Sequence, residues 1–371
     1  MAAVERPDTV EAAAELMRGL DGRTVRPRGG GTKLGWSAGD DPAVELDTRG
    51  LNRLLEHNEG DFTAVLEAGT PLVEAQATFA AAGQMLALDP PLGADDAATI
   101  GGVIAANDSG PLRHRYGGMR DLVVGITVVL SDGTVAKSGG KVIKNVAGYD
   151  LAKLFAGSFG TLGLIARVAV RLHPAPAATA TVTGRSDDPD ALGAAAIALA
   201  RHPLEADCLD VSWAEGSGRL MVRFGGATAE QLAHAAAERF TGIEDVETET
   251  ADDELWARHR ATQRSPEGVV VKVSGRPTDL PAVIRAAQAG GGTVASRAAL
   301  GLSWVALGAG GDVAAIRAAL PGRSCSVLDG ASGVDEPWPD VDRGRLAVME
   351  RIKARFDPAR AFRPGAFVGG I

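Results

Sequence analysis

The chain has 371 residues, enough for two or three domains, and an ordinary globular composition with 45% hydrophobic and 23% charged residues. Its net charge of −9 argues against general nucleic-acid binding. Its two cysteines, far apart and outside any CxxC pair, argue against a zinc site, an iron–sulfur cluster and a disulfide framework. No apolar run reaches membrane-spanning length and the acidic start does not resemble a signal peptide, so we expect a cytoplasmic protein with no membrane span.

The N-terminal region predicts a helix, a strand and then a glycine-rich loop. The helix is expected over 9–18, with Asp8 as its N-cap and Glu11 as the capping-box partner. A strand beginning at Thr24 leads into Arg28-Gly29-Gly30-Gly31-Thr32. Consecutive amide N–H groups in such a loop can bind an anion, typically a phosphate, although an ordinary surface turn would have the same composition.

Two familiar nucleotide-binding patterns are missing from the chain. No GxGxxG opens a helix after a strand, and no GxxxxGK[ST] occurs. Nicotinamide and ATP are therefore disfavoured as primary ligands.

The central stretch, 89–165, is dense in small residues and reads as tight loops between buried strands, an arrangement that can wrap an extended cofactor. The hairpin signal Asp132-Gly133 joins two of these strands. Around this stretch we expect strands at 44–46, 63–67, 122–130, 134–137 and 164–172, an apolar connection at 51–55, a helix at 72–82 and a short helix from Tyr149.

The pattern changes after residue 175. Two β-α-β-β-α series about ninety residues apart, separated by an acidic segment at 244–254, predict a duplicated ferredoxin-like cap with a sheet on one side and helices on the other. A last helix from Arg343 ends near Phe356 and is expected to dock on the body. We therefore predict an α+β chain with domains at 1–175 and 176–335 and a returning C-terminal segment at 336–371.

Several motifs occur together and in order along the first half of the chain. They are PRGGGT at 27–32, ATIGG at 98–102, NDSGP at 107–111, KNVAGYDL at 144–151 and GSFGTLG at 157–163. This set resembles the vanillyl-alcohol oxidase (PCMH-type) FAD-binding family, and the KNVAGYDL block is most similar to the E subunits of bacterial glycolate oxidases. The resemblance implies a two-part FAD-binding domain.

The resemblance also implies where FAD would bind. The 28–32 loop would cradle the pyrophosphate, the 107–110 loop would pass beside the ribityl chain and isoalloxazine, and Ile165 would meet the adenine through its main chain. The first loop holds no histidine, so FAD would be noncovalent. The implied cofactor-binding residues are Arg28, Gly29, Gly30, Gly31, Thr32, Pro90, Gly93, Thr99, Gly101, Gly102, Asn107, Ser109, Gly110, Gly163 and Ile165.

The implied activity is oxidation of a small 2-hydroxy acid, glycolate to glyoxylate, within a complex. The partners would be a D-type flavoprotein subunit and an F-type iron–sulfur subunit, and they could hold the chain at the inner face of the membrane. The cap lacks the family's histidine-rich block, since 300–340 contains no histidine, so no catalytic residue and no metal site is assigned. A self-sufficient FAD-dependent 2-hydroxyacid or alditol dehydrogenase, and a structural subunit that has lost FAD, are the alternatives.

Some single residues keep two interpretations. His114, Lys141, Lys144 and Arg363 could each lie near the flavin or its phosphates, or simply at the surface. Three cations are candidates for binding a substrate carboxylate, namely Arg113, Arg115 and Arg297.

Overall fold

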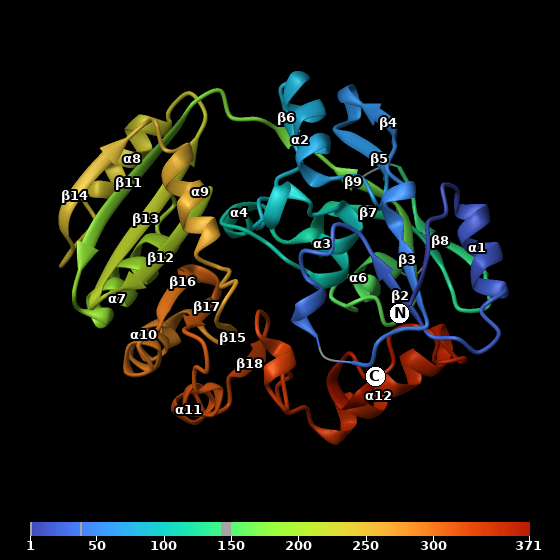
Figure 1. The fold of residues 1–371 in the computed structure, drawn as a ribbon. Helices are drawn as coiled ribbons and strands as arrows, with labels where there is room; N and C mark the ends of the chain where they lie inside the picture. The colour runs from blue at the N-terminus through green and yellow to red at the C-terminus, as the bar shows by residue number, and fades with distance from the viewer. Residues whose placement is uncertain (1, 38, 142–149) are drawn as a thin grey trace.

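The computed structural model describes residues 2–37, 39–141 and 150–371. Two bodies lie side by side in Figure 1: one holds the N-terminal half and the C-terminal segment, and the other holds the strands from β11 to β18. Helices and strands are mixed in both, so the predicted α+β class is confirmed.

The N-terminal sheet has three parallel strands in the order β1-β3-β2 and packs against helix α1. The predicted cap residue of that helix is wrong by one position. Thr9, in extended conformation, accepts a hydrogen bond from Ala12 N at 3.1 Å, so its hydroxyl satisfies the amide that Asp8 was expected to cap. The elements are β1 (Ala3–Glu5), α1 (Val10–Arg18), β2 (Val25–Arg28) and β3 (Val44–Asp47).

A second, antiparallel sheet of five strands has the order β4-β5-β9-β7-β8. The prediction of a mere connection at 51–55 is wrong, because Leu54 begins an edge strand whose half-exposed sequence LLEHN lacks a clear alternation. The strands are β4 (Leu54–Asn58), β5 (Thr63–Glu67), β7 (Val123–Val129), β8 (Val135–Gly139) and β9 (Leu164–Arg171); the helices packed on them are α2 (Leu72–Ala81), α3 (Ile100–Ala106), α5 (Met119–Leu122) and α6 (Leu151–Phe155). A two-stranded antiparallel ribbon pairs β6 (Gln84–Met85) with β10 (His173–Pro174), and β10 is followed in the chain by the first strand of the second body.

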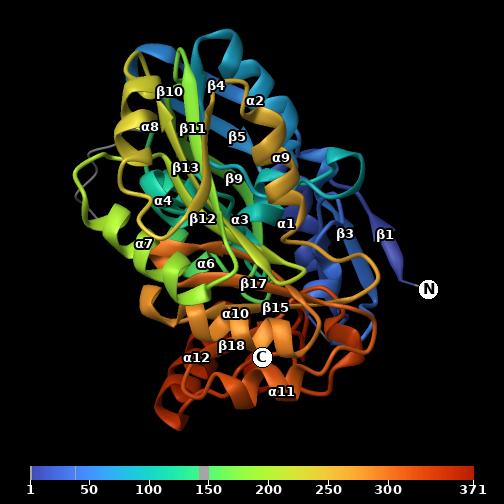
Figure 2. The ribbon, with the colours of Figure 1, turned by 90° about the vertical axis from the view of Figure 1, so that its left-hand side faces the viewer.

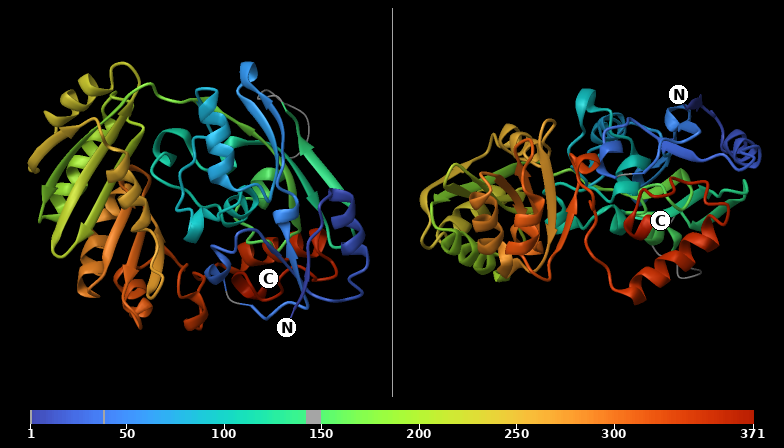
Figure 3. Two further views of the ribbon diagram at one scale, coloured as in Figure 1. Left: turned by 45° about the horizontal axis from the view of Figure 1, so that its top comes forward. Right: turned by 60° about the horizontal axis from the view of Figure 1, so that its bottom comes forward.

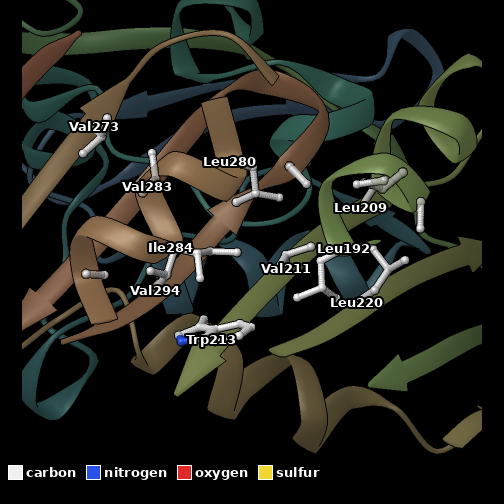
Figure 4. Close-up of a cluster of buried hydrophobic side chains, with 14 of the residues drawn as sticks. Leu192, Leu209, Val211, Trp213, Leu220, Val273, Leu280, Val283, Ile284 and Val294 are labelled. Carbon is white, nitrogen blue, oxygen red and sulfur yellow. The ribbon is translucent and has the colours of Figure 1, made fainter. Parts of the chain in front are cut away.

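The second body is one sheet of eight strands in the order β14-β11-β13-β12-β16-β17-β15-β18. Each half has the ferredoxin-like order 4-1-3-2, and the halves join through antiparallel pairing of β12 with β16. Four helices cover one face, where the apolar core lies (Figures 2 and 4). The elements are β11 (Thr179–Ser186), α7 (Pro189–Arg201), β12 (Cys208–Ala214), β13 (Ser217–Gly225), α8 (Ala229–Ala237), β14 (Glu244–Glu249), β15 (Val269–Ser274), α10 (Leu280–Ala289), β16 (Thr293–Arg297), β17 (Leu302–Leu307), α11 (Val313–Ala319) and β18 (Ser324–Val327).

The acidic segment at 244–254, for which the sequence predicts no helix or strand, contains regular structure. It contains the edge strand β14, whose acidic side chains are largely exposed and discourage edge-to-edge pairing. It then enters helix α9 (Asp253–Ala261), which packs Leu255 and Trp256 on the sheet face opposite the other four helices. Helix α9 therefore lies between the eight-stranded sheet and the first body (Figure 1).

The C-terminal segment returns to the first body. Helix α12 (Arg343–Phe356) lies along it, away from the cap sheet (Figure 3). The buried Lys353 Nζ donates 2.7 Å hydrogen bonds to the carbonyls of Thr161 and Phe362 and to Asp357 Oδ2. Within the part of the chain that is described, no helix has the length and apolar character needed to cross a bilayer.

Candidate functional site

A pocket of about 750 Å³, open to solvent, lies where the glycine-rich loop after β2 meets helix α3. Most of the sequence-predicted cofactor residues line it, although they come from three separate stretches of chain. These are Arg28, Gly29, Gly30, Gly31, Thr32, Thr99, Gly101, Gly102, Gly163 and Ile165.

The first loop contributes its backbone to the lining of this pocket. The amides of Gly30, Gly31 and Thr32 donate no hydrogen bond to any described residue. Gly31 has φ +76°, and a Cβ at Gly30 would overlap the carbonyl oxygen of Ala97. Only glycine allows the loop to pack this closely on the segment before α3, and the packing leaves three neighbouring N–H groups free for an anion.

The cations of the pocket differ in how they are paired. Arg28 donates to Glu45 Oε1 at 2.6 Å, and Lys33 lies 3.4 Å from Asp108 Oδ2. Arg363, from the C-terminal segment, donates to the carbonyl of Phe159 at 2.9 Å and to Ser37 Oγ.

No described carboxylate lies within 4.0 Å of the Arg363 guanidinium. Burial, helped by the charge of Arg26, lowers the Arg363 pKa to about 10, which leaves the group protonated at neutral pH. Arg363 is therefore not a surface residue, and it brings an uncompensated positive charge to the pocket.

A residue of the cap, Arg264, also contacts the first loop. Arg264, which follows helix α9, donates to the carbonyl of Thr32 at 2.9 Å and to Asp329 at 2.8 Å. Asp329 in turn accepts a hydrogen bond from Trp36 Nε1 at 2.9 Å. The geometry of the loop thus depends on the cap as well as on its own glycines.

Five predicted cofactor residues do not line this pocket. Gly93 packs on Thr32, Gly110 packs on Asp89, and Pro90 is buried. Ser109 is buried; its hydroxyl accepts from Arg113 at 3.2 Å and its carbonyl from Gln263 at 3.2 Å. The fifth, Asn107, lines a second chamber described next, and its buried Oδ1 has no hydrogen-bond partner within the described ranges.

The second chamber, of about 780 Å³, adjoins the first pocket and shares Ala106 and Phe159 with it. Cap strands β15 and β18 form one wall and the C-terminal segment forms another. Lys272 on β15 lines it, a residue that sequence reasoning missed. The signal was present, because Lys272 interrupts the apolar strand sequence VVVKVS on the face opposite the cap core.

A buried polar cluster lies beside the chamber, between cap sheet and helix α9. Asp210 Oδ2 accepts from Arg297 and from His259 Nε2, both at 2.7 Å, and Arg297 also donates to Gln263. Sequence reasoning searched 300–340 for a histidine and so did not single out His259. Its imidazole is 3% exposed and it does not line either pocket.

Two of the other residues with two interpretations, His114 and Lys141, lie outside the two pockets. His114, in the short helix α4 (Arg113–Tyr116), lines a small cavity against the cap, and burial lowers its pKa. Lys141 is exposed and pairs with Glu56, while Lys144 lies outside the described residues, as does most of the KNVAGYDL block.

The three cations proposed for a substrate carboxylate are also engaged elsewhere. Arg297 is fully buried against Asp210, Arg113 bonds Ser109, and Arg115 pairs with Asp207 at 3.2 Å. None of the three lines the second chamber.

Comparison with known proteins agrees with this geometry. Residues 1–139 match the family described as FAD binding domain. Over 134 residues the chain is 37% identical to glycolate oxidase subunit GlcE of Escherichia coli, covering 36% of this chain and 38% of the relative. Over 168 residues it is 36% identical to glycolate oxidase subunit GlcD of Bacillus subtilis, covering 45% of this chain and 35% of the relative. Each match thus spans well under half of the curated relative.

The similarity in fold to a solved structure covers nearly the whole chain. The solved structure of an alkyldihydroxyacetonephosphate synthase superposes with a TM-score of 0.72 at 15% identity, covering 97% of this chain and 76% of that one. At this identity the likeness concerns the fold alone.

The residues of the first pocket fit FAD. Three free amides and the unpaired Arg363 suit a doubly charged pyrophosphate, and the glycines leave room for the backbone to approach it. The orphaned Oδ1 of Asn107, at the junction with the second chamber, can accept a hydrogen bond from a polar ring edge. These residues would hold the cofactor, whose chemistry when bound is to accept a hydride.

Proposed function

Because the chain carries a PCMH-type FAD-binding domain and its cofactor is FAD, we propose that it is the E-type subunit of a glycolate oxidase-like complex that oxidises a 2-hydroxy acid to a 2-oxo acid. Support comes from the likeness to GlcE and GlcD and from the pocket that gathers most of the predicted FAD residues. The proposed partners are a D-type flavoprotein subunit and an F-type iron–sulfur subunit, and the proposed location is the cytoplasm.

The observation that carries the subunit role concerns proton transfer. Oxidation of a hydroxy acid needs a base within hydrogen-bond reach of the hydroxyl proton. No histidine, aspartate or glutamate occurs among the described residues that line the first pocket or the second chamber. The imidazole of His259 is hydrogen-bonded to Asp210 and does not line either cavity.

The chain's own residues would therefore bind FAD and orient a ligand, with the oxidation depending on partner subunits. The described lining of the first pocket also contains no histidine or cysteine that could form a covalent flavin bond. Acid denaturation is expected to release intact FAD.

Co-expression tests the proposal. The chain is produced with its D-type and F-type neighbours and purified through a tag on this chain alone. The proposal predicts co-purification of a complex that reduces a dye acceptor with a 2-hydroxy acid, and loss of that complex's activity when this chain is omitted. A D–F pair with full activity in its absence would contradict the role.

A further inference from the structure

One wall of the second chamber carries a compact polar group built on the cap sheet. Lys272 on β15 lies directly across from Ser326 on β18 and from Trp304 on β17. Ser274, two residues further along β15, points to the same face because strand side chains alternate. Lys272, Ser274 and Ser326 all line the chamber, so one ammonium and two hydroxyls meet there.

The Lys272 ammonium forms no ion pair with any described residue. No carboxylate in the described ranges lies within 4.0 Å of its Nζ, which stands 5.6 Å from the centroid of the Trp304 ring. Burial lowers the pKa of Lys272 to about 8; Asp108 opposes this shift, and Arg113 and Arg297 add to it. A cation in this position gains from a bound anion, which replaces the water that burial removes.

The opposite wall is aromatic and apolar. Phe159 meets Trp338 with ring centroids 4.8 Å apart, and Trp338 meets Phe367 at 4.7 Å. Val341 and Met349 extend this wall along the C-terminal segment. The chamber thus has one cationic end and a long apolar side.

We propose that the second chamber binds a monocarboxylate with an apolar tail, its carboxylate at Lys272, Ser274 and Ser326 and its tail against Phe159, Trp338 and Val341. The inference rests on the proposed function in one respect, because that function makes the bound acid a 2-hydroxy acid substrate. The apolar wall then indicates a substrate larger than glycolate. A two-carbon acid would leave the aromatic wall in water. A dicarboxylate would place a second charge there, where the described lining offers no second cation.

Binding of a tail series to the FAD-loaded protein tests the site. Sodium butyrate, hexanoate and octanoate are titrated calorimetrically, with glycolate as the short reference. Affinity is expected to rise about two- to fourfold per methylene until the wall is covered. These unsubstituted acids have no hydroxyl to oxidise, so the measurement is independent of any oxidase activity.

Variants separate the two walls. Lys272→Met should weaken every acid roughly ten- to hundredfold, whereas Lys272→Arg should retain most of the affinity. Val341→Asp, on a half-exposed loop, should weaken octanoate and leave glycolate unchanged. Lys137→Met, at an exposed lysine of β8, is the matched control and should change nothing.

Three results would overturn the inference: affinity that does not depend on tail length, octanoate binding that survives Lys272→Met, or octanoate that displaces FAD. If the tail series binds as expected but 2-hydroxyoctanoate is not oxidised in the assembled complex, the chamber assignment stands and the proposed function fails. If the complex oxidises glycolate while octanoate does not bind, the reverse holds.

Discussion

The first pocket and the second chamber adjoin each other but are built in different ways. The pocket rests on short runs of consecutive residues, chiefly 28–32 and 99–102, whose backbone faces the ligand. The chamber collects single side chains from the cap strands, the loop after α6 and the C-terminal segment. A backbone site made of glycines leaves a motif in the sequence, whereas a side-chain site assembled from distant strands leaves isolated residues.

The backbone site should be broken most completely by Gly30→Asp. Its Cβ would overlap the Ala97 carbonyl and its carboxylate would repel a phosphate. FAD affinity is expected to fall ~100-fold or more while the apoprotein stays folded, measured by flavin fluorescence titration and circular dichroism. Gly35→Asp is the matched control, because no atom lies within 4 Å of a Cβ added there. Normal flavin content in Gly30→Asp would remove the phosphate assignment.

Lys353→Met should destabilise the C-terminal segment, which contributes residues to both the first pocket and the second chamber. This change leaves the Asp357 carboxylate buried without its cation, with an expected loss of about 3–5 kcal/mol in the free energy of unfolding. Urea unfolding measures the loss. Lys153→Met removes an exposed ion pair and should cost less than about 1 kcal/mol. Equal effects of the two substitutions would show that the buried pair does not hold the segment.

The boundary between the two bodies should respond to pH through Asp89. Burial raises its pKa to about 6, although Arg260 lies 3.6 Å away. The stabilising contribution of the protonated form is complete below about pH 4 and is lost as the pH rises through 6. The stability of the wild type relative to Asp89→Asn should therefore fall by about 2 kcal/mol between pH 4 and pH 7.

Denaturant unfolding at several pH values gives that difference. Asp96→Asn, at an exposed position of the neighbouring loop, supplies the control. If the difference in the free energy of unfolding between wild type and Asp89→Asn stays constant across this range, the pKa of Asp89 is not raised by folding.

The smallest expected effect is on FAD affinity. It comes from Arg363, the side chain that adds a positive charge to the backbone site. Arg363→Gln removes the unpaired charge and should weaken FAD about tenfold, with Arg363→Lys in between. The loss should shrink for riboflavin, which has no phosphate, and at high salt. Arg360→Gln, exposed on the same segment, is the control. An equal loss for riboflavin and FAD would assign Arg363 a structural role instead.

The glycine-rich loops of the backbone site can be recognised in the sequence because their signals are local. Glycine loops, the hairpin at Asp132-Gly133 and the repeated cap order all depend on neighbouring residues, and the structure contains them. Strand β14 was missed because its exposed edge has no apolar alternation. Helix α9 was missed because it buries few apolar side chains.

The chamber could not be assembled from sequence for a physical reason. The partners of Lys272, namely Ser326 and Trp304, are set by strand register, and the aromatic wall is set by the return of the C-terminal segment. The same holds for His259, whose pairing with Asp210 joins residues 49 positions apart.

The central claim is that this chain holds FAD but has no histidine or carboxylate base among the described residues that line its two cavities. Anaerobic mixing of the isolated, FAD-loaded chain with glycolate, lactate and 2-hydroxyoctanoate, followed by flavin absorbance, tests it most directly. The account predicts an oxidised flavin spectrum that persists, with bleaching restored on addition of the partner subunits. Rapid bleaching by any of these acids in the partner-free protein would contradict it and identify a self-sufficient dehydrogenase.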